Sequence, residues 1–123
     1  MSDDILKYLP EKVVSVDVIV TEERLAHIRE RHEADYPLFL QYGEICIAQP
    51  DIVAKDEKNI GTYFMIKKCP GVSLNVVVRM VLSEENPLLK SSVMTFYRIR
   101  DKNLGKLLKK NRIFYQSKSI STE

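Results

Sequence analysis

The sequence has few of the features that would assign a small protein to a specialised class. Its 123 residues include two cysteines, Cys46 and Cys69, whose separation fits neither a CxxC pair nor a zinc-ligand spacing. We expect both to be small core residues in a reducing compartment, with a lone disulfide or a nucleophilic cysteine as alternatives. No apolar run approaches the ~18 residues of a membrane-spanning helix. No basic segment followed by an apolar core opens the chain. We therefore expect no membrane partner, no secretory signal and a cytoplasmic location.

The signature motifs of several large enzyme classes are also missing. The chain has no P-loop, no GxGxxG, no GxSxG and no paired-carboxylate metal cluster. Asp51, Asp56 and Glu57 are close in sequence, but they flank a predicted turn and are expected to be solvated. A two-metal nuclease needs carboxylates that converge on metals about 4 Å apart. We therefore expect neither a metal nor a cofactor.

Charge is distributed unevenly along the chain. Residues 1–61 hold 7 Lys/Arg against 13 Asp/Glu, a net charge of −6, and residues 62–123 hold 12 against 4, a net charge of +8. Such asymmetry is typical of a surface that faces a polyanion, although a solvated basic helix would produce the same pattern.

Hydrophobic periodicity predicts one α+β domain over residues 1–123, with its core at about 13–117. We expect an N-terminal strand (14–20) and two helices (22–33 and 38–48), followed by an antiparallel sheet of three to four strands and a short C-terminal helix. The predicted sheet strands are 51–55, 62–68, 73–82 and 92–100, the helix is 102–111, and 112–117 is a candidate final strand. Short turns between these strands favour antiparallel pairing, because parallel strands need long crossovers.

The only two histidines, His27 and His32, both fall in the first predicted helix. Their i, i+5 spacing turns the rings about 140° apart on a regular helix, and no third ligand accompanies them, so zinc is not expected. His32 lies on the apolar stripe and should face inward or toward the edge of a cleft. His27 lies on the polar flank near Glu23, which is placed to set its tautomer. The alternative is one core histidine and one solvent histidine.

Two of the predicted strands collect polar side chains on one face. If Met94 and Phe96 belong to the core, alternation places a second set of side chains together on the opposite face. That set contains Asn75, Arg79, Thr95 and Tyr97. An amide, a guanidinium, a hydroxyl and a phenol are donors suited to a phosphate group. Ordinary cross-strand polar pairing is the alternative.

Several segments occur in a familiar order. A valine-rich strand ends in Thr21, a helix carries HIRERH, a second helix leads into AQPDIV, and a later strand reads VMTFYRI. This order resembles the phage- and mobile-element-associated nuclease-like domains of the barnase, EndoU, colicin and RelE (BECR) superfamily, over residues 13–117. The sequence departs from the pattern at Glu33, where a proline is expected, and in its lysine-rich C-terminal helix.

The resemblance implies a small α+β ribonuclease that needs no metal and acts as a toxin or effector. Its catalytic positions fall on His27, His32, Thr95 and Tyr97, to which the sheet-face argument adds Arg79. In such a reaction a histidine pair supplies the base and the acid, and a cation offsets charge on the phosphate. The basic residues expected to hold the RNA backbone are Arg31, Arg98, Arg100, Lys106, Lys109, Lys110 and Arg112.

The sequence therefore predicts a metal-independent endoribonuclease that forms a 2′,3′-cyclic phosphate. The candidate partners are RNA, with tRNA as one possible substrate, and a cognate inhibitor protein. The main alternative is a non-catalytic RNA- or protein-binding module on the same scaffold, such as an immunity or antitoxin-like protein or a degenerate phage domain. A third hypothesis is an unrelated α+β interaction protein. Nothing in the sequence indicates an oligomeric state.

Overall fold

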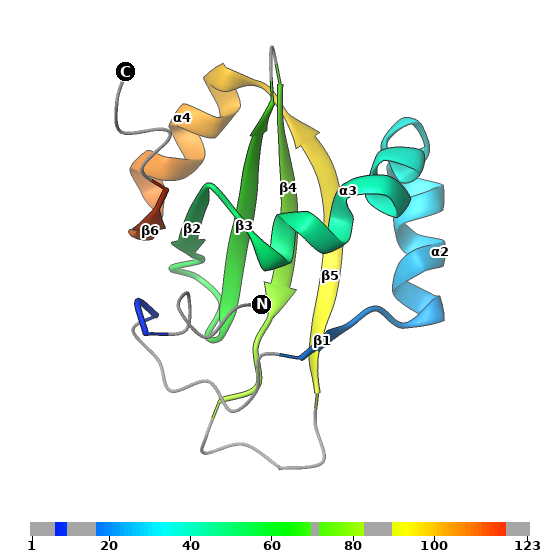
Figure 1. Ribbon diagram of the computed structural model, residues 1–123, viewed down its shortest axis with the longest axis horizontal. Helices are drawn as coiled ribbons and strands as arrows, with labels where there is room; N and C mark the ends of the chain where they lie inside the picture. Colours follow the sequence, from blue (N-terminus) through cyan, green and yellow to red (C-terminus); the bar gives the residue numbers. More distant parts are fainter. Residues whose placement is uncertain (1–6, 10–16, 70–71, 83–89, 118–123) are drawn as a thin grey trace.

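One mixed sheet organises the chain (Figure 1). The computed structural model describes residues 7–9, 17–69, 72–82 and 90–117. Six strands lie in the order β1-β5-β4-β3-β2-β6, and all neighbours are antiparallel except β1 and β5, which are parallel. The strands are β1 (Val18–Ile19), β2 (Ile52–Lys55), β3 (Thr62–Cys69), β4 (Val72–Arg79), β5 (Ser91–Ile99) and β6 (Ile113–Gln116). The predicted α+β class is confirmed.

The first helix begins at the predicted residue, and the other two begin one or two residues before their predicted starts. They are α2 (Glu22–Arg31), the 3-10 helix η1 (Glu33–Asp35), α3 (Tyr36–Ala48) and α4 (Asp101–Lys110). Thr21 caps α2, because its side chain accepts a hydrogen bond from the Arg24 N–H at 3.2 Å. Glu22 and Glu23 follow in the first turn, where carboxylates favour the helix dipole. Pro37 occupies the first turn of α3, where it breaks no helical hydrogen bond.

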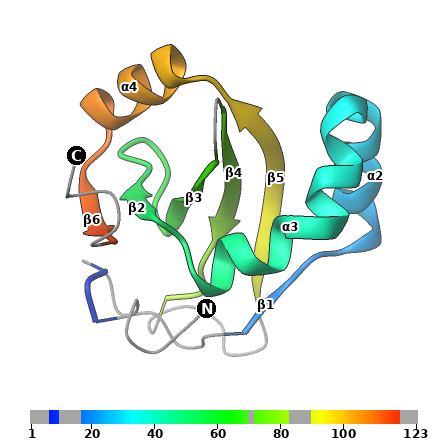
Figure 2. The same ribbon diagram turned by 45° about the horizontal axis from the view of Figure 1, so that its top comes forward.

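The two faces of the sheet carry separate cores. Under α2 and α3, the α3 face buries a large apolar cluster that includes Ile28, Phe39, Val76 and Phe96. Each such side chain contributes about 1.5–3 kcal/mol when fully buried. The opposite face, here called the α4 face, holds a smaller cluster in which Leu104 of α4 packs on strand residues. Helix α4 thus covers only part of the α4 face, as Figure 2 shows.

A β-bulge between β4 and β5 decides which side chains share a face. Val77 pairs with Thr95, but Val78 pairs with Val93, so Met94 is the extra residue. Val93 and Phe96 therefore enter the α3-face core. Met94 instead lines a pocket with Val77, which corrects the prediction that it belongs to the core.

Some expectations about the sheet were wrong. The sheet has six strands rather than the predicted N-terminal strand plus three to four, because the last segment, 113–116, pairs with β2 and β1 joins the opposite edge. The strands β2 to β5 are antiparallel as predicted, whereas β1, for which no direction was predicted, is parallel to β5. Residues 14–16 of the predicted first strand lie outside the described residues, and of its remainder only Val18 and Ile19 are in a strand. The turn at 70–71 and the loop at 83–89 also lie outside the described residues.

Two predictions about single residues also need correction. Cys46 is buried as expected, but Cys69 is exposed at the end of β3, and both are free thiols. Asp51 is buried rather than solvated, and its carboxylate accepts the Lys68 N–H at 2.7 Å and the Ser117 hydroxyl at 3.2 Å. These contacts tie β3 and the segment after β6 to the start of β2. Within the described ranges, none of the helices is both long and apolar enough to cross a membrane.

Candidate functional site

The two histidines lie along the exposed edge of β5. Only Ser91 and Ser92 of β5 pair with β1, and α2 lies beside the rest of this edge (Figures 1 and 2). This placement reconciles two predictions that conflicted. One placed His32 on the apolar stripe of its helix, and the other placed Thr95 and Tyr97 on the face of the sheet opposite the core. A helix at the edge reaches both faces.

His32 brings the site together because it is the residue at which α2 ends. Its backbone N–H still donates to the Ile28 carbonyl at 2.8 Å, but its φ of −133° and ψ of 51° leave the helical region. Its ring stacks on the ring of Tyr97, with centroids 5.7 Å apart and an interplanar angle of 28°. The centroids of the His27 and His32 rings lie 6.3 Å apart, with an interplanar angle of 71°. The 140° separation of a regular helix does not apply, because His32 has left the helix.

Thr95 and Tyr97 lie two residues apart on β5 and so share a face. Across the ladder Thr95 pairs with Val77 and Tyr97 pairs with Asn75. Thr95, Tyr97 and Asn75 therefore share one face of the sheet, as predicted, and that face is the α4 face. Tyr97 also packs against the smaller apolar cluster, beside α4.

An ion pair holds the His32 segment against β5. The Asp35 carboxylate accepts the Arg98 backbone N–H at 3.1 Å and the Arg98 Nε–H at 2.5 Å. Asp35 is three residues after His32, and Arg98 is next to Tyr97 in sequence. The pair thereby fixes the two segments that bring the stacked rings together. Sequence reasoning missed Asp35, because nothing local marks a partner 63 residues away.

Several polar groups next to this site have no visible partner. Ser73 Oγ, both amide atoms of Asn75 and Thr95 Oγ1 are buried without a hydrogen bond to any described residue. All three residues project from β4 and β5 onto the α4 face, at alternate positions along the strands. Because buried polar groups are nearly always hydrogen-bonded, this row is a place for ordered water or a polar ligand.

Arg79 lies apart from the histidines. It is four residues along β4 from Asn75, which pairs with Tyr97, and this separation corresponds to about 13 Å along a strand. Its Nη1 donates to the Met80 carbonyl and lies against Gly61. The guanidinium is therefore held at the far end of the α4 face.

The residues predicted to bind RNA differ in their surroundings. All seven are exposed, but the Arg98 guanidinium is paired with Asp35. Those on the outer surface of α4 and beside its ends are Arg100, Lys106, Lys109, Lys110 and Arg112, whereas Arg31 ends α2. Five of the seven candidate RNA-binding residues therefore lie on or beside α4.

No cluster of three potential metal ligands occurs within the described segments. The chain matches no protein-family model, no curated protein and no solved structure. Arguments about its activity therefore depend on the geometry above.

Proposed function

We propose that this protein is a metal-independent endoribonuclease that cleaves RNA by transesterification. The observation that supports this most strongly is the cluster of His27, His32 and Tyr97, in which each ring lies within 6.3 Å of the next. Imidazole suits proton transfer at neutral pH, and two imidazoles supply both the acceptor and the donor that this reaction needs.

In the proposed reaction the ribose 2′-oxygen attacks the adjacent phosphorus. One neutral imidazole takes the 2′-hydroxyl proton as the new P–O bond forms. The other imidazole, protonated, gives its proton to the 5′-oxygen as the P–O bond to that oxygen breaks. The products are a 2′,3′-cyclic phosphate and a free 5′-hydroxyl, and no electrons are gained or lost.

Two hydroxyl groups on the α4 face of β5 are suited to stabilise the phosphate. The Tyr97 phenol lies on the His32 ring, and the Thr95 hydroxyl has no partner among the described residues. Both are donors that can follow the charge growing on the phosphoryl oxygens. The exposed lysines of α4 would hold the flanking backbone with little sequence preference.

The position of Arg79 favours a second candidate, a binding module that does not cleave. Arg79 lies at the far end of the α4 face, and the charge of Arg98 is paired with Asp35. A site that binds RNA through α4 and the polar row, without a cation beside the histidines, would retain affinity and lack turnover.

Incubation of the purified protein with mixed-sequence RNA in excess EDTA distinguishes these candidates. We expect cleavage with 2′,3′-cyclic ends, lost in His27→Ala and in His32→Ala. Tyr97→Phe keeps the stacked ring but removes the hydroxyl, and should slow cleavage about 10- to 100-fold. Tyr42→Phe, at an exposed tyrosine on α3, is the matched control and should cleave normally.

Other outcomes of this assay contradict the proposal. Products with 5′-phosphate ends that appear only with magnesium would indicate a different chemistry. RNA that is bound at low salt, released at high salt and never cut would identify the binding module.

A further inference from the structure

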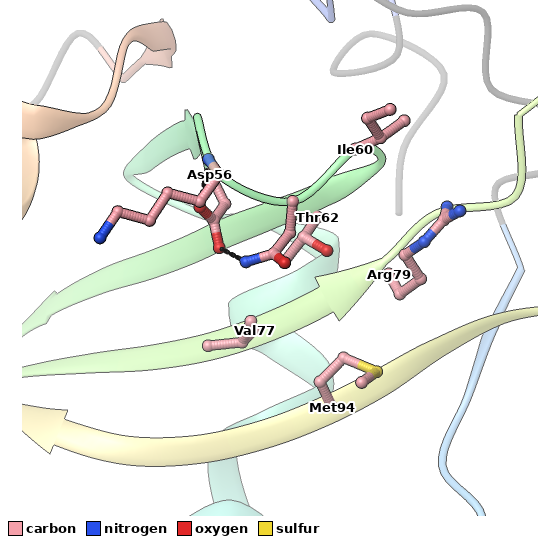
Figure 3. A pocket seen from close by; sticks show the side chains of 8 residues that line it. Asp56, Ile60, Thr62, Val77, Arg79 and Met94 are labelled. Atoms are coloured by element: carbon pink, nitrogen blue, oxygen red, sulfur yellow. Dashed lines mark hydrogen bonds between the residues drawn. The ribbon is translucent and has the colours of Figure 1, made fainter.

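A pocket opens on the α4 face, at the end away from the histidines (Figure 3). It has a volume of about 610 Å³ and lies beside the turn between β2 and β3. This volume is within the usual range for small-molecule sites. Val77 and Met94 lie on its strand side, and Ile60 stands at its rim with 70% of its surface exposed. An exposed isoleucine beside an apolar floor provides two surfaces for a flat apolar ring.

Hydrogen bonds within the turn close the rim of the pocket. Asp56 accepts the Lys58 backbone N–H at 2.9 Å and the Asn59 side-chain amide at 2.8 Å. The Thr62 N–H donates to the Asn59 carbonyl at 3.2 Å, and the Asp56 N–H donates to the Thr62 carbonyl at 2.9 Å. A turn closed by these bonds loses little conformational entropy when it binds a ligand.

Two cationic side chains, Lys58 and Arg79, line the same pocket, together with the Asp56 carboxylate. Arg79 is held in place by the Met80 carbonyl and by Gly61, where any Cβ would overlap the guanidinium. Gly61 also has a φ of +76°, which L side chains rarely adopt. Glycine at this position therefore allows the guanidinium to pack against the turn.

We propose that this pocket binds one ribonucleotide unit, with the base against Val77, Met94 and Ile60 and the phosphate at Lys58 and Arg79. The apolar surfaces fit a planar heteroaromatic ring, and the cations fit an anion attached to it. The two cations, Lys58 and Arg79, outnumber the single carboxylate of Asp56, so the lining has a net positive charge.

The pocket lies one step along the sheet from the histidine site. Val77, on its floor, pairs with Thr95, and the next pair on this face is Asn75 with Tyr97, about 7 Å away. The unpartnered Thr95 hydroxyl lies between the two sites. The pocket's role as the subsite for the nucleotide next to the cleaved bond rests on the proposed function, whereas nucleotide binding by the pocket does not.

Titration of the full-length protein with AMP, GMP, CMP and UMP, followed by backbone amide NMR shifts, tests the pocket directly. We expect shifts at residues 56–62 and at Val77 and Met94, with a Kd of about 0.01–1 mM for at least one nucleotide. The corresponding nucleoside and inorganic phosphate are titrated in parallel and should each bind at least about tenfold more weakly.

Matched surface variants separate the two parts of the ligand. Ile60→Ser should raise the Kd of the nucleotide about threefold to tenfold. Leu40→Ser, at an α3 residue with 63% exposure, should not change it. Lys58→Gln should raise the nucleotide Kd about threefold to tenfold, and Lys68→Gln on the exposed end of β3 should not. Both test residues are exposed, so these variants are expected to fold.

The controls make failure of this inference distinct from failure of the proposed function. The His27→Ala/His32→Ala double variant should bind nucleotides like the wild type. Absence of nucleotide-induced shifts at residues 56–62 overturns the pocket assignment even if RNA is cleaved. Equal affinity for phosphate and nucleotide also overturns it, because the base would then contribute nothing. Nucleotide binding without RNA cleavage supports the pocket and contradicts only the nuclease.

Discussion

Asp35 and Arg98 form a two-point contact between the segment after α2 and strand β5. One carboxylate oxygen accepts the Arg98 backbone N–H and the other accepts its Nε–H. The contact joins residues 63 positions apart and lies next to the stacked rings of His32 and Tyr97. An ion pair that is mostly buried on the carboxylate side has a positional role even where its net energy is small.

Removing one partner of this contact should both destabilise the protein and loosen the histidine site. We expect Asp35→Ala to lower the free energy of unfolding by about 1–2 kcal/mol, because the guanidinium is partly solvated and pays a reduced desolvation cost. Urea denaturation of Asp35→Ala, Arg98→Ala and the double variant measures the coupling. Additive losses would show that the two side chains do not stabilise each other.

The two helical glycines Gly43 and Gly105 should respond to alanine with opposite signs. A Cβ at Gly43 would lie 2.8 Å from two atoms of the Phe39 ring, so that buried ring must move. We expect Gly43→Ala to cost about 1–3 kcal/mol. A Cβ at Gly105 meets nothing within 4 Å, and Gly105→Ala should stabilise α4 by about 0.5–1 kcal/mol. Thermal unfolding of the two variants measures both changes in stability. If both variants were stabilised or both destabilised, the packing around Gly43 and Gly105 would be contradicted.

Asn75 offers a test of whether water occupies the polar row. Its side-chain amide is fully buried and makes no hydrogen bond to any described residue. If the site is dry, Asn75→Leu removes an unpaired polar group of similar size and should raise stability by about 1–3 kcal/mol. A loss of stability of similar size would show that bound water or another polar partner satisfies the amide.

The two thiols should differ in reactivity. Burial, with a smaller contribution from Cys69, raises the pKa of the Cys46 thiol to about 12 from the ordinary value of 9.0. Cys46 is therefore neutral at pH 8, and the thiolate is the reactive form. Iodoacetamide followed by mass spectrometry should find Cys69 modified and Cys46 protected under native conditions. Equal labelling of both thiols would contradict the burial of Cys46.

The raised pKa also implies a direction for stability at high pH. Above pH 9 the unfolded chain releases the Cys46 proton while the folded chain keeps it, so the unfolded state binds fewer protons. Stability attributable to this thiol should therefore fall as pH rises from 9 to about 12. Comparing the wild type with Cys46→Ala in urea at pH 8 and pH 10.5 measures the effect. The difference in free energy of unfolding between the wild type and Cys46→Ala should be smaller at pH 10.5 than at pH 8.

Local sequence signals predicted the helices and the central strands well. Thr21 with two following glutamates specifies the start of α2. The alternation of Leu74, Val76 and Val78 specifies a strand whose one face enters the α3-face core, although its other face is buried as well. These features depend on neighbours a few residues away. The predicted ends of these helices and strands differ from the observed ones by up to three residues, because helix and strand termini respond to packing.

The arrangement of the candidate site was predictable only in part. Alternation along β4 and β5 correctly placed Asn75 and Tyr97 on one face. The bulge that moved Met94 out of the core has no clear mark in the sequence, since it is a property of the pairing between two strands. A helical wheel separated His27 from His32, because it assumes that both residues belong to the helix.

The sequence by itself determined the α+β class, the start of α2 and the alternation along β4, because these follow from short-range sterics and hydrophobic period. Only the tertiary structure decided that α2 lies at the edge of β5, that His32 leaves the helix onto Tyr97, and that Asp35 meets Arg98. Each of these depends on contacts between residues far apart in the chain. Such contacts are selected by the packing of the whole sheet, and no local pattern encodes them.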